Sequence, residues 1–193
     1  MMTVFDLYEL QEYIEDCTAC ELHEGRLNPV VDKGKITSRI FICGMVPAKE
    51  ENEKGIPFVG RAGQLLDVIL EKLDLTLSDV YITNLVKCFL AAGQPLKEEW
   101  VDACLPFLLA QIAVANPKVI ITLGADAAAA LIGKEFDTIS KNRGREFKFQ
   151  NGTVVIPTYH PSYLLRQGGE KSPNFETVLN DFRIAINTSE RSQ

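Results

Sequence analysis

Short apolar runs alternate with helical patterns along this chain. Residues 39–43, 80–83, 119–123 and 154–156 have the length and the β-branched content of buried strands. Apolar residues recur at helical intervals in residues 4–16, 62–73, 97–115, 125–131 and 175–186. This alternation predicts an α/β fold of three layers, α/β/α, with a mainly parallel central sheet.

The length and composition of the chain indicate one domain. With 193 residues and 46% hydrophobic content, it can form one sizeable core, so we expect a single domain over residues 1–193. Asn151-Gly152, between residues 147–149 and 154–156, predicts a β-hairpin. No segment approaches the ~20 apolar residues of a membrane span, and we expect no membrane association. The first 16 residues carry acids and no secretory apolar run, which favours the cytoplasm.

Four cysteines are spaced like metal ligands. Cys17 and Cys20 form a C-x-x-C pair, and Cys88 and Cys104 each lie on a separate segment. Thiolates that converge in a domain of this size usually bind iron or zinc. Zinc sites commonly use two close pairs, so the pattern favours an iron–sulfur cluster, with zinc and ordinary buried thiols as alternatives. Cys43, inside an apolar run, is interpreted as a small buried hydrophobe.

The charge balance excludes a generic nucleic-acid coat. The net charge is −6, whereas binding dominated by phosphates requires a surplus of Lys and Arg. Lys141, Arg143, Arg145 and Lys148 nevertheless cluster in one stretch. This stretch forms either a local basic face or a solvated hairpin.

Polar and glycine-rich loops follow three of the predicted strands. Gly44 begins the first loop, Asn84 the second, and His160 lies in the third. In parallel sheets, ligands bind beyond the carboxyl ends of the strands, so we expect a site there. Phe58 belongs to the first loop and either contacts a ligand or plugs the space beneath the loop. For His160, the alternative to a functional role is a core histidine.

An ordered set of motifs resembles the iron–sulfur uracil-DNA glycosylases called family 4, over nearly the whole chain. The motifs are Cys17-x-x-Cys20, the PFVGRAGQLL run at 57–66, NLVKC at 84–88, C-x-PFL at 104–108 and HPSYLLR at 160–166. The resemblance implies a uracil-DNA glycosylase-like fold and a 4Fe–4S cluster on Cys17, Cys20, Cys88 and Cys104. It also implies DNA that contains uracil as the partner, single- or double-stranded, and a monomer.

The resemblance implies roles for individual residues. Phe58 would stack on the extruded uracil, and Asn84 would recognise the base edge through its amide. His160 would stabilise negative charge on the departing base. The resemblance also implies that Glu51 is catalytic. It implies further substrate-binding residues, which are Gly44, Met45, Val46, Ser162 and Arg166. Of these, Ser162 and Arg166 are suited to binding phosphates.

The chain departs from the family pattern in the first motif, which usually reads Gly-Glu-Gly-Pro-Gly and continues to Glu-Asp. Met45 replaces the Glu, Val46 and Ala48 replace two glycines, and Asn52 replaces the Asp. Gly44, Pro47 and Glu51 remain, and the motif is more similar to the Gly-Leu-Ala-Pro-Ala version of the broader-specificity family 5. After Cys88, residues 89–94 (FLAAGQ) replace a stretch normally rich in Arg, Pro and Asn.

These departures leave several functions open. The chain is a working uracil glycosylase with altered kinetics, a relative specific for another deaminated base, or a DNA-binding homologue with little activity. A non-catalytic iron–sulfur or nucleic-acid binding module is the alternative from another class. The intact set of Phe58, Asn84 and His160 favours the enzyme, because binding alone has no evident need for all three.

Overall fold

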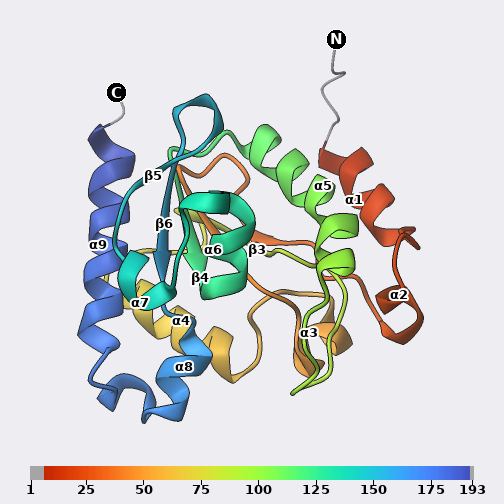
Figure 1. Ribbon diagram of the computed structural model, residues 1–193, viewed down its shortest axis with the longest axis horizontal. Coiled ribbons are helices and arrows are strands. Elements are labelled where there is room, and N and C mark those ends of the chain that lie inside the picture. Colours follow the sequence, from red (N-terminus) through yellow and green to blue (C-terminus); the bar gives the residue numbers. More distant parts are fainter. Residues whose placement is uncertain (1–6, 192–193) are drawn as a thin grey trace.

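Buried β-branched residues form the strands of a central sheet in the computed structural model, which describes residues 7–191 (Figure 1). The sheet contains six strands, in the spatial order β1-β3-β2-β4-β6-β5. In chain order they are β1 (Lys33–Gly34), β2 (Ile40–Gly44), β3 (Val80–Asn84), β4 (Val119–Leu123), β5 (Phe147–Lys148) and β6 (Val154–Thr158). The four inner strands are parallel, and the edge strands β1 and β5 are antiparallel to their neighbours.

Helices cover both faces of this sheet. The α-helices of the described residues are α1 (Leu7–Glu15), α2 (Leu22–Gly25), α3 (Lys49–Lys54), α4 (Arg61–Glu71), α5 (Glu98–Ala115), α6 (Ala125–Ile132), α7 (Ile139–Asn142), α8 (Pro161–Arg166) and α9 (Phe175–Arg191). Short 3₁₀ turns cover Gly133–Glu135, Gln150–Gly152 and Gly169–Lys171. Helix α9, on the left of Figure 1, and helix α5, on the right, flank the sheet.

Alternate residues of each strand face opposite layers, as the pleat of a strand requires. Ile42 of β2 packs with α4, α8 and α9, whereas its neighbour Phe41 packs with α5 and α6. Helix α1 lies outside α5 and buries Leu10 and Ile14. The three-layer α/β/α architecture expected from the sequence is therefore confirmed.

The hairpin expected at Asn151-Gly152 is present, with the turn Gln150–Gly152 between β5 and β6. Several other elements differ from the sequence-based expectations. Helix α9 continues to Arg191, five residues past its expected end. The first expected helix is present as α1, and its predicted start at residues 4–6 lies outside the described residues. The two-residue edge strand β1 and the short helices α2, α3, α7 and α8 were not expected, because they are too short to carry a periodic pattern.

The sheet topology has a switch point next to β2. The chain adds β3 on one side of β2 and then returns to add β4 on its other side. Loops that leave β2 and β4 at their carboxyl ends therefore diverge and leave room for a ligand. In the β2–β3 pair, Gly44 lies opposite Asn84, and the backbone N–H of Leu85 donates to the carbonyl of Gly44 over 2.9 Å.

The basic stretch from Lys141 to Lys148 serves the fold at one of its positions. Arg143 pairs with the buried carboxylate of Asp181 on α9, which also accepts from the hydroxyl of Thr158 at 2.6 Å. Lys141 pairs with Asp137 over 2.6 Å.

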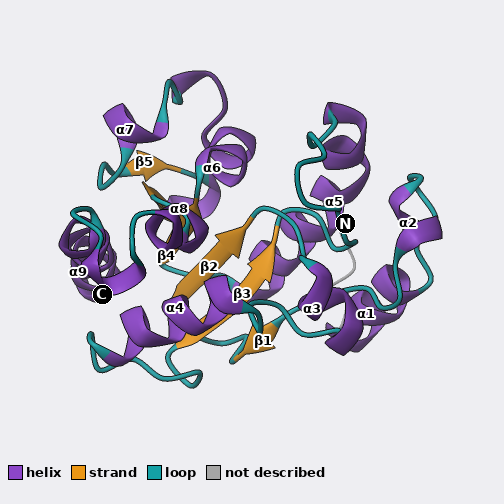
Figure 2. Cartoon of the chain, turned by 90° about the horizontal axis from the view of Figure 1, so that it is seen from below, coloured by secondary structure: helices purple, strands orange, loops and turns teal. Residues whose placement is uncertain are grey.

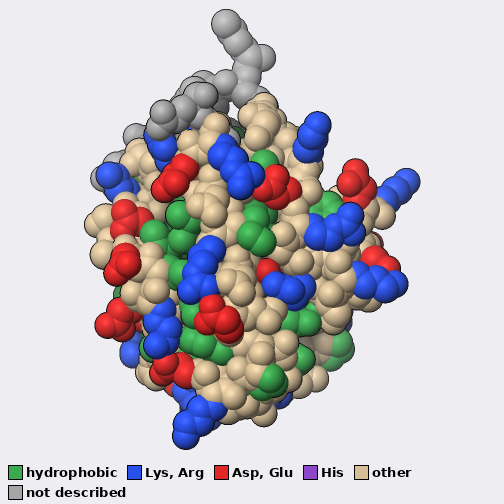
Figure 3. All heavy atoms as spheres, turned by 90° about the vertical axis from the view of Figure 1, so that its left-hand side faces the viewer, with side chains coloured by type: hydrophobic (Ala, Val, Ile, Leu, Met, Phe, Trp, Pro, Cys, Tyr) green, Lys and Arg blue, Asp and Glu red, His purple; other side chains and the backbone are tan. Residues whose placement is uncertain are grey.

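On the face shown in Figure 3, acidic and basic side chains are interspersed rather than grouped by sign. Among the described residues, no helix has the length and apolar character needed to cross a bilayer.

Candidate active site and cysteine cavity

A small cavity lies at the carboxyl ends of β2, β3 and β6. It is lined by Val46, Ala48, Glu51, Phe58, Ala62, Asn84 and His160. Phe58, Asn84 and His160, predicted from three separate loops, are therefore brought together. This is the arrangement expected where parallel strands end at one edge of a sheet.

Asn84 is the last residue of β3, and only 2% of it is exposed. Its side-chain amide lines the cavity and makes no hydrogen bond within residues 7–191. A Cβ atom at Gly44 would lie 2.3 Å from its Oδ1 and 2.5 Å from the Phe58 ring. Glycine is therefore the residue that lets the amide and the ring lie beside β2.

Phe58 is buried, and its backbone has a left-handed φ of +53°. Its ring centroid is 6.1 Å from that of His160, with the two planes tilted by 32°. A Cβ atom at Gly63 would lie 1.9 Å from the Phe58 carbonyl oxygen, so helix α4 approaches this loop as closely as glycine allows.

His160 is held in one tautomer by Ser162. The backbone N–H of Ser162 donates to Nδ1 over 3.1 Å, and the Ser162 hydroxyl lies 2.8 Å from the same atom. Because a backbone N–H always donates, Nδ1 is an acceptor, and the proton of the neutral ring lies on Nε2. Burial of the ring and the nearby Arg166 guanidinium lower the pKa of His160 to about 4, while Glu51 opposes this shift.

Glu51, on α3, is buried and uses its carboxylate to hold backbone groups. Its Oε1 accepts from the N–H groups of Val59 and Gly60 over 3.0 and 2.9 Å, and its Oε2 accepts from the N–H of Ala48 over 3.2 Å. The two loops that line the cavity are thus joined through one carboxylate.

A second, wider cavity of about 390 Å³ adjoins the first, and the two share Val46 and His160. Its other lining residues are Met45, Leu123, Gly124, Ala125, Asp126, Ile139, Ser140, Tyr159, Ser162, Tyr163 and Arg166. Tyr159 and Tyr163 stack with ring centroids 4.8 Å apart, and the Arg166 guanidinium lies 6.0 Å from the Tyr163 centroid. Met45 thus belongs to this wider cavity rather than to the small one.

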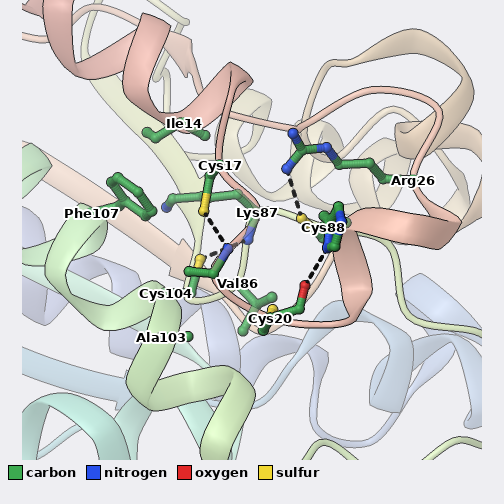
Figure 4. Close-up of a pocket in the computed structure, with 12 residues that line it drawn as sticks. Ile14, Cys17, Cys20, Arg26, Val86, Lys87, Cys88, Ala103, Cys104 and Phe107 are labelled. Atoms are coloured by element: carbon green, nitrogen blue, oxygen red, sulfur yellow. Dashed lines mark hydrogen bonds between the residues drawn. The ribbon is translucent and has the colours of Figure 1, made fainter.

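The four predicted ligand cysteines line a single cavity on the α5 side of the sheet (Figure 4). Cys17 and Cys20 come from the loop between α1 and α2, Cys88 from the loop after β3, and Cys104 from α5. The remaining walls are largely apolar, and they include Ile14 and Phe107. No three His, Cys, Asp or Glu side chains of residues 7–191 already form a metal-binding group.

The surroundings of these sulfurs fit an anionic metal centre. Arg26 donates to Sγ of Cys88 over 3.4 Å, and the backbone N–H of Lys87 donates to Sγ of Cys104 over 3.3 Å. The Lys87 side chain is buried and contacts no carboxylate within residues 7–191; its Nζ donates to Oγ1 of Thr83 over 2.8 Å and to the carbonyl of Asn84. Thiolates bound to a metal would place negative charge beside these two cations, whereas neutral thiols would not.

Burial favours the protonated thiols of Cys88 and Cys104. It raises the pKa of Cys104 to about 11 against the opposing charge of Lys87, and it also raises the pKa of Cys88. Binding of a metal must therefore displace protons from both. Cys43 lies outside the cavity, fully buried in β2, where burial raises its pKa to about 12. Its interpretation as a buried hydrophobe is confirmed.

Some residues of the site were not identified from the sequence. Lys33 on β1 donates to the carbonyl of Phe58, and Ala62, Asp126 and Ser140 line the cavities. Tyr159 directly precedes the HPSYLLR motif and Tyr163 lies within it. Two aromatic residues four positions apart beside a loop were the signal that could have revealed their stacking.

Comparison with known proteins agrees with this geometry. Residues 31–183 match the family described as the uracil DNA glycosylase superfamily. A type-4 uracil-DNA glycosylase of Thermotoga maritima is 44% identical over 86% of this chain and 87% of its own length. A type-4 enzyme of Pyrobaculum aerophilum is 38% identical over 84% and 86%, and a type-5 enzyme of the same organism is 28% identical over 70% and 66%. The chain therefore belongs to the uracil-DNA glycosylase superfamily and, within it, to the type-4 family.

Proposed function

We propose that this protein removes uracil from DNA by hydrolysing the N-glycosidic bond, and that it leaves an abasic site for repair. The observation that carries the proposal is the convergence of Phe58, Asn84 and His160 on one small cavity. Membership of the type-4 family supports the same reaction.

The small cavity is suited to a base flipped out of the stack. A planar base in this cavity can stack on the Phe58 ring and present its polar edge to the amide of Asn84. The amide provides a donor and an acceptor, which match O4 and N3–H of uracil. Nearly complete burial of Asn84 excludes competing water and strengthens this recognition.

His160 is suited to stabilise the departing base. As the glycosidic bond lengthens, the sugar becomes oxocarbenium-like and the base becomes anionic. A neutral imidazole that carries its proton on Nε2 can donate a hydrogen bond to this anion, and the bond strengthens as the charge develops. Ser162 orients the ring for this role, and the depressed pKa keeps it neutral at physiological pH.

The first motif supplies less to catalysis than in its relatives. Met45 has no charge with which to orient water or to balance the oxocarbenium-like sugar. All three described hydrogen bonds of the Glu51 carboxylate go to backbone N–H groups. We therefore assign Glu51 to positioning the cavity walls and expect slow uracil excision.

The wider cavity is suited to the DNA strand on either side of the flipped nucleotide. Arg166 provides a cation for a phosphate, and the stacked tyrosines provide flat apolar surface. Both the N–H and the hydroxyl of Ser162 are engaged with Nδ1 of His160, so Arg166 rather than Ser162 is the group suited to a phosphate. Met45 and Val46 contribute the wall on the β2 side, and Gly44 lies behind it, against Asn84 and Phe58.

We assign a 4Fe–4S cluster to Cys17, Cys20, Cys88 and Cys104. When bound, such a cluster supplies iron–thiolate bonds that tie three chain segments together and needs no redox step. Arg26 and Lys87 would balance its charge. A monomer in a reducing cytoplasm is consistent with these thiols and with DNA as the substrate.

The test compares wild-type protein with His160→Ala on oligonucleotides that contain one uracil, hypoxanthine or xanthine, single- and double-stranded. Alkali then cleaves the strand at each abasic site. We expect cleavage at uracil by the wild type and at least a 10²-fold loss in the variant, the range for a group that stabilises a developing anion. Equal cleavage by both proteins would contradict the role given to His160, and binding without base release would contradict the proposed reaction. Faster release of hypoxanthine or xanthine would contradict uracil as the preferred base.

A further inference from the structure

One peptide group of the Phe58 loop is held at both ends by opposite charges. Its carbonyl, that of Phe58, accepts from Nζ of Lys33 over 2.9 Å. Its N–H, that of Val59, donates to Oε1 of Glu51 over 3.0 Å. A peptide group fixed at both its donor and its acceptor cannot rotate without losing two charge-assisted hydrogen bonds.

This fixation matters because Phe58 has an unfavourable backbone conformation. A left-handed φ is uncommon and strained for an aromatic residue. If the peptide group were released, the loop would relax and the ring would leave the wall of the base cavity. The ring direction therefore depends on the groups that hold the peptide.

Lys33 reaches this peptide group from a distant part of the chain. It lies on β1, the edge strand (Figure 2), opposite Ile82 of β3. Its side chain is only 13% exposed, and its Nζ also lies 3.6 Å from the carboxylate of Asp67 on α4. The ammonium group is thus directed inward, onto the loop, by its burial and by its carboxylate partner.

We propose that Lys33 is a positioning residue for uracil binding, which acts by fixing the Phe58–Val59 peptide group. Lys33 is not among the residues that line the small or the wider cavity, so its effect passes through Phe58. The proposal deepens the proposed function, because it rests on stacking of the base on Phe58.

The main test is steady-state kinetics of Lys33→Met on single-stranded uracil DNA, at iron content equal to that of the wild type. Stacking binds the base in the ground state and the transition state alike, so we expect KM to rise about 10-fold while kcat changes little. Lys33→Arg should restore most of the affinity. Lys35→Met, which removes the same charge from an exposed position two residues away, should leave KM unchanged.

Two further measurements separate positioning from other roles. In a double-mutant cycle, Lys33→Met should add little to KM in a Phe58→Ala background. The dependence of log KM on log salt concentration should keep its wild-type slope, whereas loss of a phosphate contact would lower the slope by about 1.

Different failures have different meanings. Normal KM in Phe58→Ala would overturn the stacking role itself, and the Lys33 proposal with it. Raised KM in Phe58→Ala with normal KM in Lys33→Met would overturn the Lys33 proposal alone. Additive effects in the cycle, failure of Lys33→Arg to rescue, or a reduced salt slope would also overturn it.

Discussion

The backbone N–H of Ser162 donates to Nδ1 of His160 over 3.1 Å, so the proton of the neutral ring lies on Nε2. This contact comes from the first turn of α8, which His160 caps. It determines which ring atom can donate to a departing base. Its consequences appear most directly in the pH dependence of the reaction.

Base release should stay constant as the pH falls from 8 to about 5 and should decrease as it approaches 4. Burial and Arg166 depress the pKa of His160 to about 4, so the ring stays neutral through the range in which an ordinary histidine gains a proton. Single-turnover rates across this range provide the measurement, with far-ultraviolet circular dichroism as a control for folding. An inflection near 6.5 would contradict the neutral ring.

The same shift affects stability. Because the folded pKa of His160 lies below its unfolded value, the unfolded state binds more protons between pH 6.5 and about 4. The contribution of neutral His160 is thus present above pH 6.5 and is lost as the pH falls toward 4. Denaturant titrations should show a smaller pH dependence in His160→Ala than in the wild type over this window.

Met45→Glu should accelerate uracil release. The wider cavity that Met45 lines has room for a carboxylate near His160, and a positioned carboxylate can contribute on the order of 10²-fold. Met45→Gln is the matched control, because glutamine has the shape of glutamate without its charge. This variant should release uracil no faster than the wild type. Single-turnover rates at equal iron content decide the matter; equal rates in all three proteins would exclude this position from catalysis.

Gly44→Ala should reduce activity by about 10²-fold, the scale expected for small displacements of catalytic groups. The added methyl group would collide with both the Asn84 amide and the Phe58 ring. Gly25→Ala is the control, because nothing lies within 4 Å of its Cβ position. Thermal melting should show a folded Gly44→Ala protein; full activity would mean that this wall of the cavity moves freely.

Cys88→Ser and Cys104→Ser should each lose iron and melt at a lower temperature, since removal of one ligand leaves the other thiols and two cations unsatisfied. Cys43→Ala should retain its iron, because Cys43 lies outside the cysteine cavity. Iron and zinc analysis with visible absorption spectra provides the measurement, and about four irons per wild-type chain are expected. Stoichiometric zinc in colourless protein would contradict the cluster.

Much of the fold could be predicted because the inner strands are buried on both faces. The run from Ile40 to Cys43 is apolar at every position, as a strand between two helical layers requires. Strand β1 could not be predicted, because its two residues, Lys33 and Gly34, are too few to show a periodic pattern. Its position is determined by pairing with β3, which is a tertiary interaction.

The residues of the candidate site that follow strands could be predicted from the sequence. Those whose role depends on a contact formed only in the folded structure could not. Asn84 ends β3 and His160 follows β6, so the rule for parallel sheets placed them together. Nothing in the sequence indicates that Lys33 contacts the carbonyl of Phe58, 25 positions away. The contact between Ser162 and His160 was equally hidden, because local hydrogen bonds depend on how α8 begins.

The turn between Asn84 and Cys88 joins the base cavity to the cysteine cavity. Its Lys87 ammonium group holds the Asn84 carbonyl, and its Lys87 carbonyl accepts from the backbone N–H of Val30. An insertion or deletion of one residue here would move either the amide that recognises the base or the thiol that binds the metal. Because residues 84–88 are also all buried, both the length and the side chains of this segment are constrained by the two cavities that it joins.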